Sequence, residues 1–442
     1  MTPGDTTGAV LFYSHLKKYS PGGIMPNNNN IDVLIEQAVF TDDSGKKTEN
    51  YRLIRETALN LGIFPASINS LYRAAGKGLY SGITVPAINI RGITYHVARA
   101  VFRAAMKDKV GAFIFEIARS EIDYTDQTPA EYASCVLAAA VKEGYKGPVF
   151  VMGDHFQVRR AMFRENPEGE LKDIKKLISD SIEAGFYNID IDASTLVDLS
   201  KPTLEEQQSK NSEITAEMTR FIRSIEPKGV TVSVGGEIGE IGKGNSTVAD
   251  LRAFMDVYQK YLGNDMEGIS KISVQTGTTH GGVALPDGSI AKVSIDFNTL
   301  KELSQISRVE YGMGGAVQHG ASTLPDEAFD MFPRVGTVEV HLATGFQNII
   351  YDSHHFPKDL LERIYGYLDE HCSNERKDGQ TEEQFLYNTR KKGFGNFKKE
   401  LWHLPESKLH DLMLELEDRF SLIFHKLNVM NSDALVKKHV TG

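Results

Sequence analysis

The sequence has few cysteines, with Cys135 and Cys372 the two present in 442 residues. Two cysteines are too few for a disulfide framework, and Cys135, in the apolar stretch ASCVLAAAV, is expected to be a small buried side chain. No apolar run approaches the roughly 18 residues of a membrane span. The first residues, MTPGDTTGAV, lack the basic start and apolar region of a secretory signal. We therefore expect a cytoplasmic protein that does not enter a membrane.

The chain also lacks an excess of positive charge. It has 49 Lys and Arg against 59 Asp and Glu, a formal net charge of −10. No basic field of the whole chain can then attract nucleic acid or an anionic membrane. An anionic small molecule would have to be held locally, by backbone N–H groups and helix N-termini.

Two phosphate-loop motifs, GxGxxG and GxxxxGK[ST], are absent, and no repeat at a solenoid period is present. Eight segments, most of them rich in Val and Ile and soon followed by Gly, Ser, Thr or Asn, alternate with helical patterns such as LKDIKKLISDSIEAGF. Buried parallel strands have this composition. The segments are 84–90, 112–117, 148–154, 187–193, 231–238, 271–277, 315–320 and 337–343. The alternation predicts an α/β fold, a (β/α)8 TIM barrel rather than an open doubly wound sheet.

The chain divides into an N-terminal extension (1–82), the barrel (83–355) and a helical C-terminal extension (356–442). In the last part, KLHDLMLELEDRFSLIFHKL is apolar along one face and must cover either the outside of the barrel or a second subunit. The charge runs TRKKG and NERKDGQTEEQ indicate solvated faces and loops.

Three histidines follow strand-like segments: His155 in FVMGDHF, His280 in ISVQTGTTHGG and His319 in GGAVQHGAS. A closed parallel barrel gathers the carboxyl ends of its strands at one rim, so these imidazoles could converge there. Three neutral imidazoles leave one coordination position open, as in a catalytic Zn²⁺ site. One such histidine alone is more simply a solvated or core side chain, but three in matching positions favour a metal site.

Other polar residues also lie at predicted strand ends, and a barrel with a purely structural role has little reason to place them in its mouth. The array therefore predicts an active site. Asp154, beside the first histidine, could exchange a proton with a substrate hydroxyl or orient an imidazole. The remaining residues of the array are Asn89, Glu116, Asp192, Glu237 and His341.

Seven segments resemble class II (zinc-dependent) fructose-bisphosphate and ketose-bisphosphate aldolases in order and spacing, over about residues 83–352. They are VPAINIRG, GDH, NIDIDAS, GGEIGEIG, GTTHGG, VQHGASTLP and VGTVEVHLAT. The resemblance implies reversible aldol cleavage of a ketose (bis)phosphate or related sugar phosphate through a metal-stabilised enediolate. It also implies Zn²⁺ as cofactor, leaves open a monovalent cation beside it, and implies a homo-oligomer, either dimer or tetramer.

Residue by residue, the resemblance makes His155, His280 and His319 the zinc ligands and Glu237 the ligand of an alternative metal position. Asp154 matches the acid–base that exchanges the hydroxyl proton. Phosphate contacts fall on Gly281, Gly320, Ser322 and Thr344. Asn89, at the end of the first barrel strand, is a further candidate for substrate binding.

The last strand departs from the family pattern. The family usually has Asn-x-Asp-Thr there, whereas this chain has His341, Leu342, Ala343 and Thr344. His341 could bind phosphate, replace the Asn as a donor or act as an acid–base, or it could pack under the C-terminal extension.

Two further departures concern a lysine and a catalytic glutamate. The Lys that usually follows the second zinc histidine is absent. The usual loop glutamate after the fifth strand is also absent; Glu240 is the nearest candidate base and Asp250 a distant one. His354 and His355, in YDSHHF, are interpreted as a loop pair rather than ligands.

An aldolase is therefore the leading hypothesis. The alternatives are another metal-dependent barrel enzyme, a hydrolase or an epimerase, and an aldolase-like subunit without catalytic activity.

Overall fold

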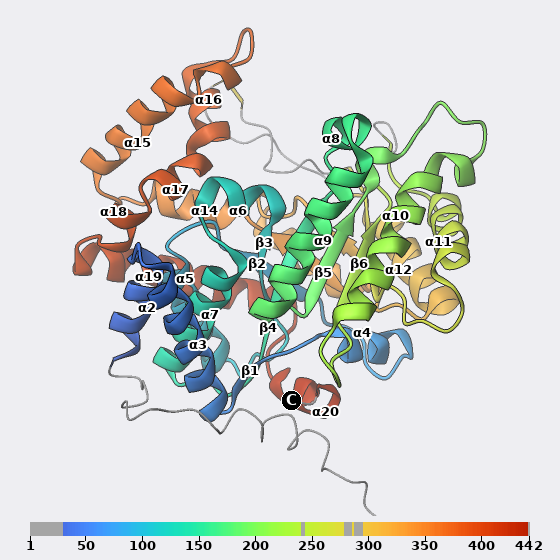
Figure 1. Cartoon of the computed structure of the whole chain (residues 1–442), viewed down its shortest axis with the longest axis horizontal. Coiled ribbons are helices and arrows are strands. Elements are labelled where there is room, and N and C mark those ends of the chain that lie inside the picture. The colour runs from blue at the N-terminus through green and yellow to red at the C-terminus, as the bar shows by residue number, and fades with distance from the viewer. Residues whose placement is uncertain (1–29, 240–243, 278–284, 287–294, 441–442) are drawn as a thin grey trace, which may run out of the picture.

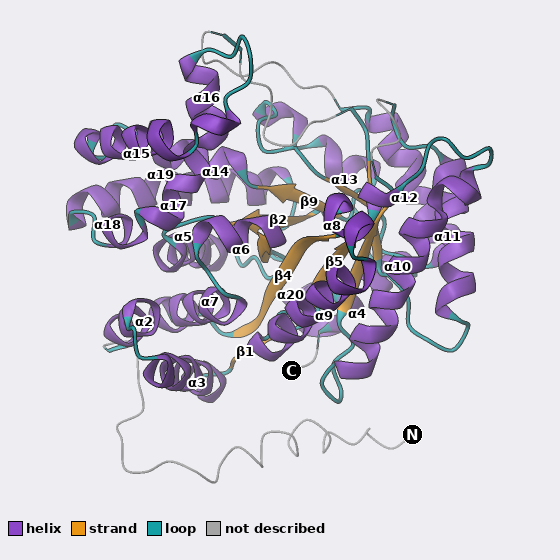
Figure 2. Cartoon of the chain, turned by 45° about the horizontal axis from the view of Figure 1, so that its top comes forward, coloured by secondary structure: helices purple, strands orange, loops and turns teal. Residues whose placement is uncertain are grey.

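The computed structural model describes residues 30–440 except 240–243, 278–284 and 287–294. Eight parallel strands close into a barrel in which each strand pairs with its neighbours in the sequence and β9 pairs with β2 (Figures 1 and 2). The predicted (β/α)8 fold is confirmed, and each of the eight predicted segments overlaps one of these strands. They are β2 (Val85–Asn89), β3 (Ile114–Ala118), β4 (Gly147–Gln157), β5 (Asn188–Asp192), β6 (Ser233–Glu237), β7 (Lys271–Val274), β8 (Ala316–Gln318) and β9 (Glu339–Leu342). Strands β3 and β4 extend beyond their predicted segments.

Helices between the strands surround the barrel (Figure 2). Their ends follow from local sequence: α9 begins with Pro167 and ends at Gly185, whose φ of 101° is readily adopted only by glycine. The outer helices are α5 (Thr94–Lys107), α6 (Arg119–Thr125), α7 (Pro129–Glu143), α8 (Arg160–Glu165), α9 (Pro167–Ala184), α10 (Leu204–Ile225), α11 (Val248–Leu262), α12 (Phe297–Tyr311), α13 (Met331–Val335) and α14 (Thr344–Asp352). No helix in the described part of the chain is long and apolar enough to cross a membrane.

The N-terminal part contains α2 (Ile31–Phe40), α3 (Ser44–Asn60), α4 (Asn69–Gly76) and a strand that was not predicted, β1 (Ile63–Pro65). Strand β1 pairs in parallel with the beginning of β4, where Ile63 lies opposite Gly147. The eleven-residue β4 is long enough to pair with β1 at its start and with β3 and β5 further along. The N-terminal segment is therefore joined to the bottom of the barrel through backbone hydrogen bonds.

The C-terminal part is helical and covers the barrel. It contains α15 (Lys358–His371), α16 (Glu382–Thr389), a 3-10 turn η5 (Arg390–Lys392), α17 (Gly393–Asn396), α18 (Lys398–Trp402), α19 (Glu406–Lys426) and α20 (Asp433–His439). The apolar face of α19, with Leu416, Phe420 and Phe424, is buried, and the helix lies beside α5 (Figure 1). The outside of the barrel, and not a second subunit, therefore covers this face.

Candidate active site

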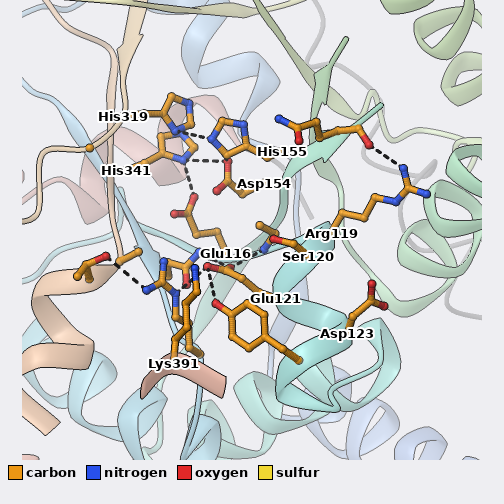
Figure 3. A pocket seen from close by; sticks show the side chains of 18 of the residues that line it. Glu116, Arg119, Ser120, Glu121, Asp123, Asp154, His155, His319, His341 and Lys391 are labelled. Atoms are coloured by element: carbon orange, nitrogen blue, oxygen red, sulfur yellow. Dashed lines mark hydrogen bonds and ion pairs between the residues drawn. The ribbon is translucent and has the colours of Figure 1, made fainter. Parts of the chain in front are cut away.

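The carboxyl ends of the strands open into a cavity of about 470 Å³, the mouth of the barrel (Figure 3). Asp154, His155, His319 and His341, all predicted from the sequence, line it. So do the predicted substrate residues Asn89, Gly320, Ser322 and Thr344. The described part of the chain thus brings together side chains from β2, β3, β4, β8 and β9 or from the residues that follow them. Glu240, His280 and Gly281 lie outside the described residues.

A bulge in β4 turns Asp154 and His155 toward the mouth. Gly153 pairs with Ile189 and Phe156 with Ile191, so β4 has one residue more than β5 between these pairs. His155 adopts a φ of 41°, in the left-handed region that is uncommon for a residue with a Cβ. A bulge of this kind re-aims side chains, which explains how two consecutive residues reach the same cavity.

His155 and His319 face one another across the mouth. The His155 Nε2 lies 3.0 Å from the His319 Nδ1. The second nitrogen of each ring has a partner on the barrel wall: His155 Nδ1 is 3.1 Å from Asp192 Oδ2, and His319 Nε2 is 3.0 Å from Ser273 Oγ. Glu237 Oε2 also lies 3.1 Å from His155 Nδ1.

These atoms fit a divalent metal. Two ligands on a tetrahedral zinc, each at 2.0–2.1 Å, lie roughly 3.3 Å apart, close to the spacing of the two facing nitrogens. Donor atoms of His155, His319 and Glu237 all lie within 4.8 Å of one another. The partners on the outer nitrogens fix the ring orientations, as is usual for metal-binding histidines.

His341, at the end of β9, lines the cavity and does not pack beneath the C-terminal helices. Its Nδ1 lies 2.8 Å from Glu116 Oε2 and 3.3 Å from Asp154 Oδ1 (Figure 3). Its Nε2 lies 2.6 Å from Glu339 Oε1. Its ring centroid is 4.0 Å from that of His319. His341 therefore contacts both the proposed acid–base and the neighbourhood of the metal ligands.

A buried charged network that was not predicted lies directly below His341. The Lys271 Nζ donates to Asp190 Oδ2 at 2.8 Å and to Glu339 Oε1, and the Tyr72 hydroxyl donates to Glu339 Oε2. Burial opposes ionisation of Glu339, but Lys271 and His341 outweigh it and hold its pKa at about 2. Glu339 is thus an ionised acceptor for His341. The sequence signal for this network is a lysine that opens a buried strand, in KISV.

The carboxylates of the mouth are strongly coupled to one another. Burial, and secondarily Asp154 and Glu339, raises the pKa of Glu116 to about 8 against the opposing effect of His341. Burial and Asp192 raise the pKa of Glu237 to about 7. Burial lowers the pKa of His155 and of His341, but the adjacent carboxylates outweigh it and raise both well above the usual range. The mouth is therefore a strongly electronegative environment that favours cations.

Positive side chains gather at the rim of the cavity. Arg91 pairs with Glu121 at 2.7 Å and Arg119 with Glu170 at 2.5 Å, whereas no ion pair of Lys391 is found among the described residues. Lys391 comes from η5 in the C-terminal part. The prediction that TRKKG is a solvated run is wrong here, because Lys391 lines the cavity and Arg390 is buried against Asp352.

The other predicted residues have defined places. The Asn89 Nδ2 donates to Glu121 Oε2 at 2.7 Å, and Thr344 begins α14. Asp250 accepts from the Thr247 N–H at 2.8 Å in the capping box of α11, so it has a structural partner. His354 and His355 lie beside Glu415 of α19.

Comparison with known proteins gives one family. The sequence matches the family model described as "Fructose-bisphosphate aldolase class-II" over residues 67–398. No curated protein matches the chain.

Several solved structures share the fold at low identity. The fructuronate-tagaturonate epimerase UxaE from Cohnella laeviribosi has a TM-score of 0.59 at 12% identity, over 86% of each chain. A probable tagatose 6 phosphate kinase from Sinorhizobium meliloti has a TM-score of 0.53 at 15% identity, over 80% of this chain and 99% of its own. The fructose-bisphosphate aldolase from Campylobacter jejuni has a TM-score of 0.50 at 17% identity, over 84% and 97%. Likeness at these identities is evidence for the fold alone.

Proposed function

Because the chain belongs to the class II fructose-bisphosphate aldolase family, we propose that it is a metal-dependent lyase that reversibly cleaves a carbon–carbon bond of a phosphorylated ketose. One observation carries the proposal. In the same cavity, His155 Nε2 and His319 Nδ1 lie 3.0 Å apart, beside Asp154.

His155, His319 and Glu237 would hold Zn²⁺, together with His280, which lies outside the described residues. When bound, the metal supplies a Lewis acid that accepts the negative charge developing on the substrate's carbonyl oxygen. The protein contributes the orientation of the ligands, since Asp192 and Ser273 hold the outer nitrogens of the two imidazoles.

Asp154 is the acid–base of the proposed reaction. In the cleavage direction it takes the proton from the hydroxyl on the carbon that becomes the aldehyde, and the electrons of the broken bond stay with the ketone fragment. In the condensation direction it returns the proton to that oxygen. His341 Nδ1 lies 3.3 Å from Asp154 Oδ1, so the imidazole borders the carboxyl group that exchanges the proton.

The phosphorylated end of the substrate would bind at the rim. Lys391 is a cation without an ion-pair partner among the described residues, while Gly320, Ser322 and Thr344 offer backbone and hydroxyl donors on the same cavity. An anion held by these groups needs no excess of positive charge on the whole protein.

The test is an aldol-cleavage assay on a panel of ketose mono- and bisphosphates, with aldehyde release measured before and after chelator treatment. We expect activity that disappears with chelator and returns with Zn²⁺ or Co²⁺. Asp154→Asn should lose at least a hundredfold in kcat, because general acid–base catalysis contributes about 10²–10⁴-fold. The matched control is Asp123→Asn, an exposed carboxylate on the same cavity, which should retain activity. Metal-loaded protein that releases no aldehyde from any substrate would contradict the proposal.

A second candidate is an epimerase, favoured by Ala343, which stands where the family has a substrate-reading Asp. The aldehyde formed by cleavage could rotate within the site and present its opposite face to the ketone fragment. When the bond forms again, the product is then the epimer at the former aldehyde carbon. The structurally similar UxaE is a fructuronate-tagaturonate epimerase. Conversion of one ketose to its epimer without free aldehyde, followed by proton NMR, would select this candidate.

A further inference from the structure

Two sets of metal-capable atoms lie side by side in the mouth, and the proposed function uses one of them. The first consists of His155, Glu237 and His319. The second consists of Asp154, His319 and His341, whose donor atoms also lie within 4.8 Å of one another. Glu116 extends the second set, because its Oε2 is 2.8 Å from His341 Nδ1.

The hydrogen bond from His341 to Glu339 determines which ring nitrogen carries the proton. The other nitrogen faces Glu116 and Asp154. His341 Nε2 lies 2.6 Å from Glu339 Oε1. Lys271 donates to the same Oε1 and the Tyr72 hydroxyl donates to Oε2, so both oxygens of Glu339 are acceptors and this ring nitrogen carries the proton and donates. In the neutral ring, Nδ1 then has a lone pair directed at Glu116 Oε2 and Asp154 Oδ1. Three acceptor atoms facing each other repel unless a cation or a further proton lies among them.

Glu116 provides independent support. It is fully buried, and its Oε1 has no hydrogen-bond partner among the described residues. It nevertheless lines the cavity, with its carboxyl group directed at His341 (Figure 3). A buried carboxylate oxygen without a partner is costly, and binding a metal is one of the ways in which proteins offset that cost.

The charged side chains of the barrel interior also favour a second cation. Lys271 is the one lysine or arginine in contact with the buried carboxylates Asp190 and Glu339 in the described residues. Four more carboxyl groups contact His155 or His341: Glu116, Asp154, Asp192 and Glu237. Carboxyl groups therefore outnumber the basic side chains that contact them, an arrangement that favours bound cations.

We propose that Glu116, Asp154 and His341 form a second divalent-cation site, next to the site of His155, His319 and Glu237. This proposal rests on the proposed function, which assigns His155, His319 and Glu237 to the first metal site. Two carboxylates and one imidazole suit Zn²⁺ or Mn²⁺. Asp154 would bind this metal through Oδ1, the oxygen that faces His341 Nδ1. Paired metals can hold two oxygen atoms of one substrate, such as the adjacent carbonyl and hydroxyl of a ketose.

The test counts metal ions on the full-length protein. Chelator-stripped protein is titrated with Mn²⁺ and, separately, with Zn²⁺, and the bound equivalents are measured after equilibrium dialysis. We expect two equivalents per chain, and one for Glu116→Gln and for His341→Gln. Asp123→Asn, which removes a carboxylate from the same cavity outside the cluster, should still bind two. The Mn²⁺-loaded wild-type protein should show the paramagnetic resonance spectrum of a coupled ion pair.

Other metal counts would separate a failure of the second site from a failure of the proposed function. One equivalent in the wild-type protein that persists in Glu116→Gln but is lost in His155→Ala overturns the second site and leaves the proposed function intact; a proton then lies between His341 and Glu116. No bound equivalent in the wild-type protein overturns both. The number of metal ions bound by the wild-type protein tests the proposal even if a variant fails to fold. Circular dichroism identifies a variant that does not fold.

Discussion

Each of the three imidazoles that the structure describes in the mouth contacts the barrel wall with one nitrogen and faces the cavity with the other. Asp192, Ser273 and Glu339 are the partners of His155, His319 and His341, in that order. The three partners lie on three different strands, β5, β7 and β9. The rigid part of the fold therefore decides which nitrogen of each ring is available to a metal.

Ser273→Ala removes the partner of His319 Nε2 without changing the cavity lining. Loss of such a partner typically weakens metal binding by about 10–100-fold, because the ring is no longer held in its ligating orientation. We expect that loss in a Zn²⁺ competition titration. Ser307→Ala removes a buried serine whose hydroxyl donates to the Leu303 carbonyl within α12, and it should leave the affinity unchanged. Equal affinities in the two variants would refute an orienting role for Ser273.

Lys391→Met should weaken the binding of phosphorylated substrate. A hydrogen bond to a charged group contributes about 1.5–3 kcal/mol, so KM should rise by at least tenfold while kcat changes less. The neighbouring Lys392 pairs with Glu375 outside the cavity lining, and Lys392→Met should leave KM unchanged. A similar KM for both variants would show that Lys391 does not contact the phosphate.

At the scale of elements, the bulge of β4 leaves no space for a side chain at Gly153. A Cβ at this position would lie 2.3 Å from Cζ of Phe156, a fully buried ring two residues beyond Asp154. Either the ring or the bulge carrying Asp154 and His155 would have to move.

Gly153→Ala should therefore lower both stability and metal affinity. Overpacking a core typically costs about 1–3 kcal/mol, measured here by urea unfolding of the chelated protein. Gly366→Ala, on α15, is the matched control, because a Cβ there meets no atom within 4 Å, and it should not destabilise the protein. An unchanged metal affinity in Gly153→Ala would show that the bulge tolerates the methyl group.

The sequence predicts the eight barrel strands because each is a buried run with a polar or Gly-containing end. It does not predict β1, because three residues ending in Pro65 have no periodicity and pair with one strand only. Convergence of His155, His319 and Asp154 is predictable from strand ends. The inward position of Lys391 is not, since a lysine in a charged turn is usually solvated and only the packing of the C-terminal helices reverses this.

At the scale of the whole molecule, metal loading should raise thermal stability. The buried carboxylates of the mouth repel one another without a cation, and a ligand present at a thousand times its Kd stabilises the folded state by about 4 kcal/mol. We expect the melting temperature to fall by several degrees on chelation and to recover with Zn²⁺, as measured by calorimetry. In His155→Ala, which lacks a proposed ligand, chelator should have a much smaller effect. An identical melting temperature with and without chelator in the wild-type protein would argue against a tightly bound metal.

The C-terminal part reaches both ends of the barrel. Lys391 lines the mouth, while near the other end the backbone N–H groups of Gly111 and Ala112, just before β3, donate to Ser432 Oγ at 3.0 Å. The ribosome makes these segments after the barrel strands. The early strands therefore leave the exit tunnel long before Ser432 is made, and the base and the mouth of the barrel are completed only when these later segments have been synthesised. A nascent chain stalled after residue 389 would carry the histidines but not Lys391, so synthesis itself sets the order in which the two sides of the cavity are formed.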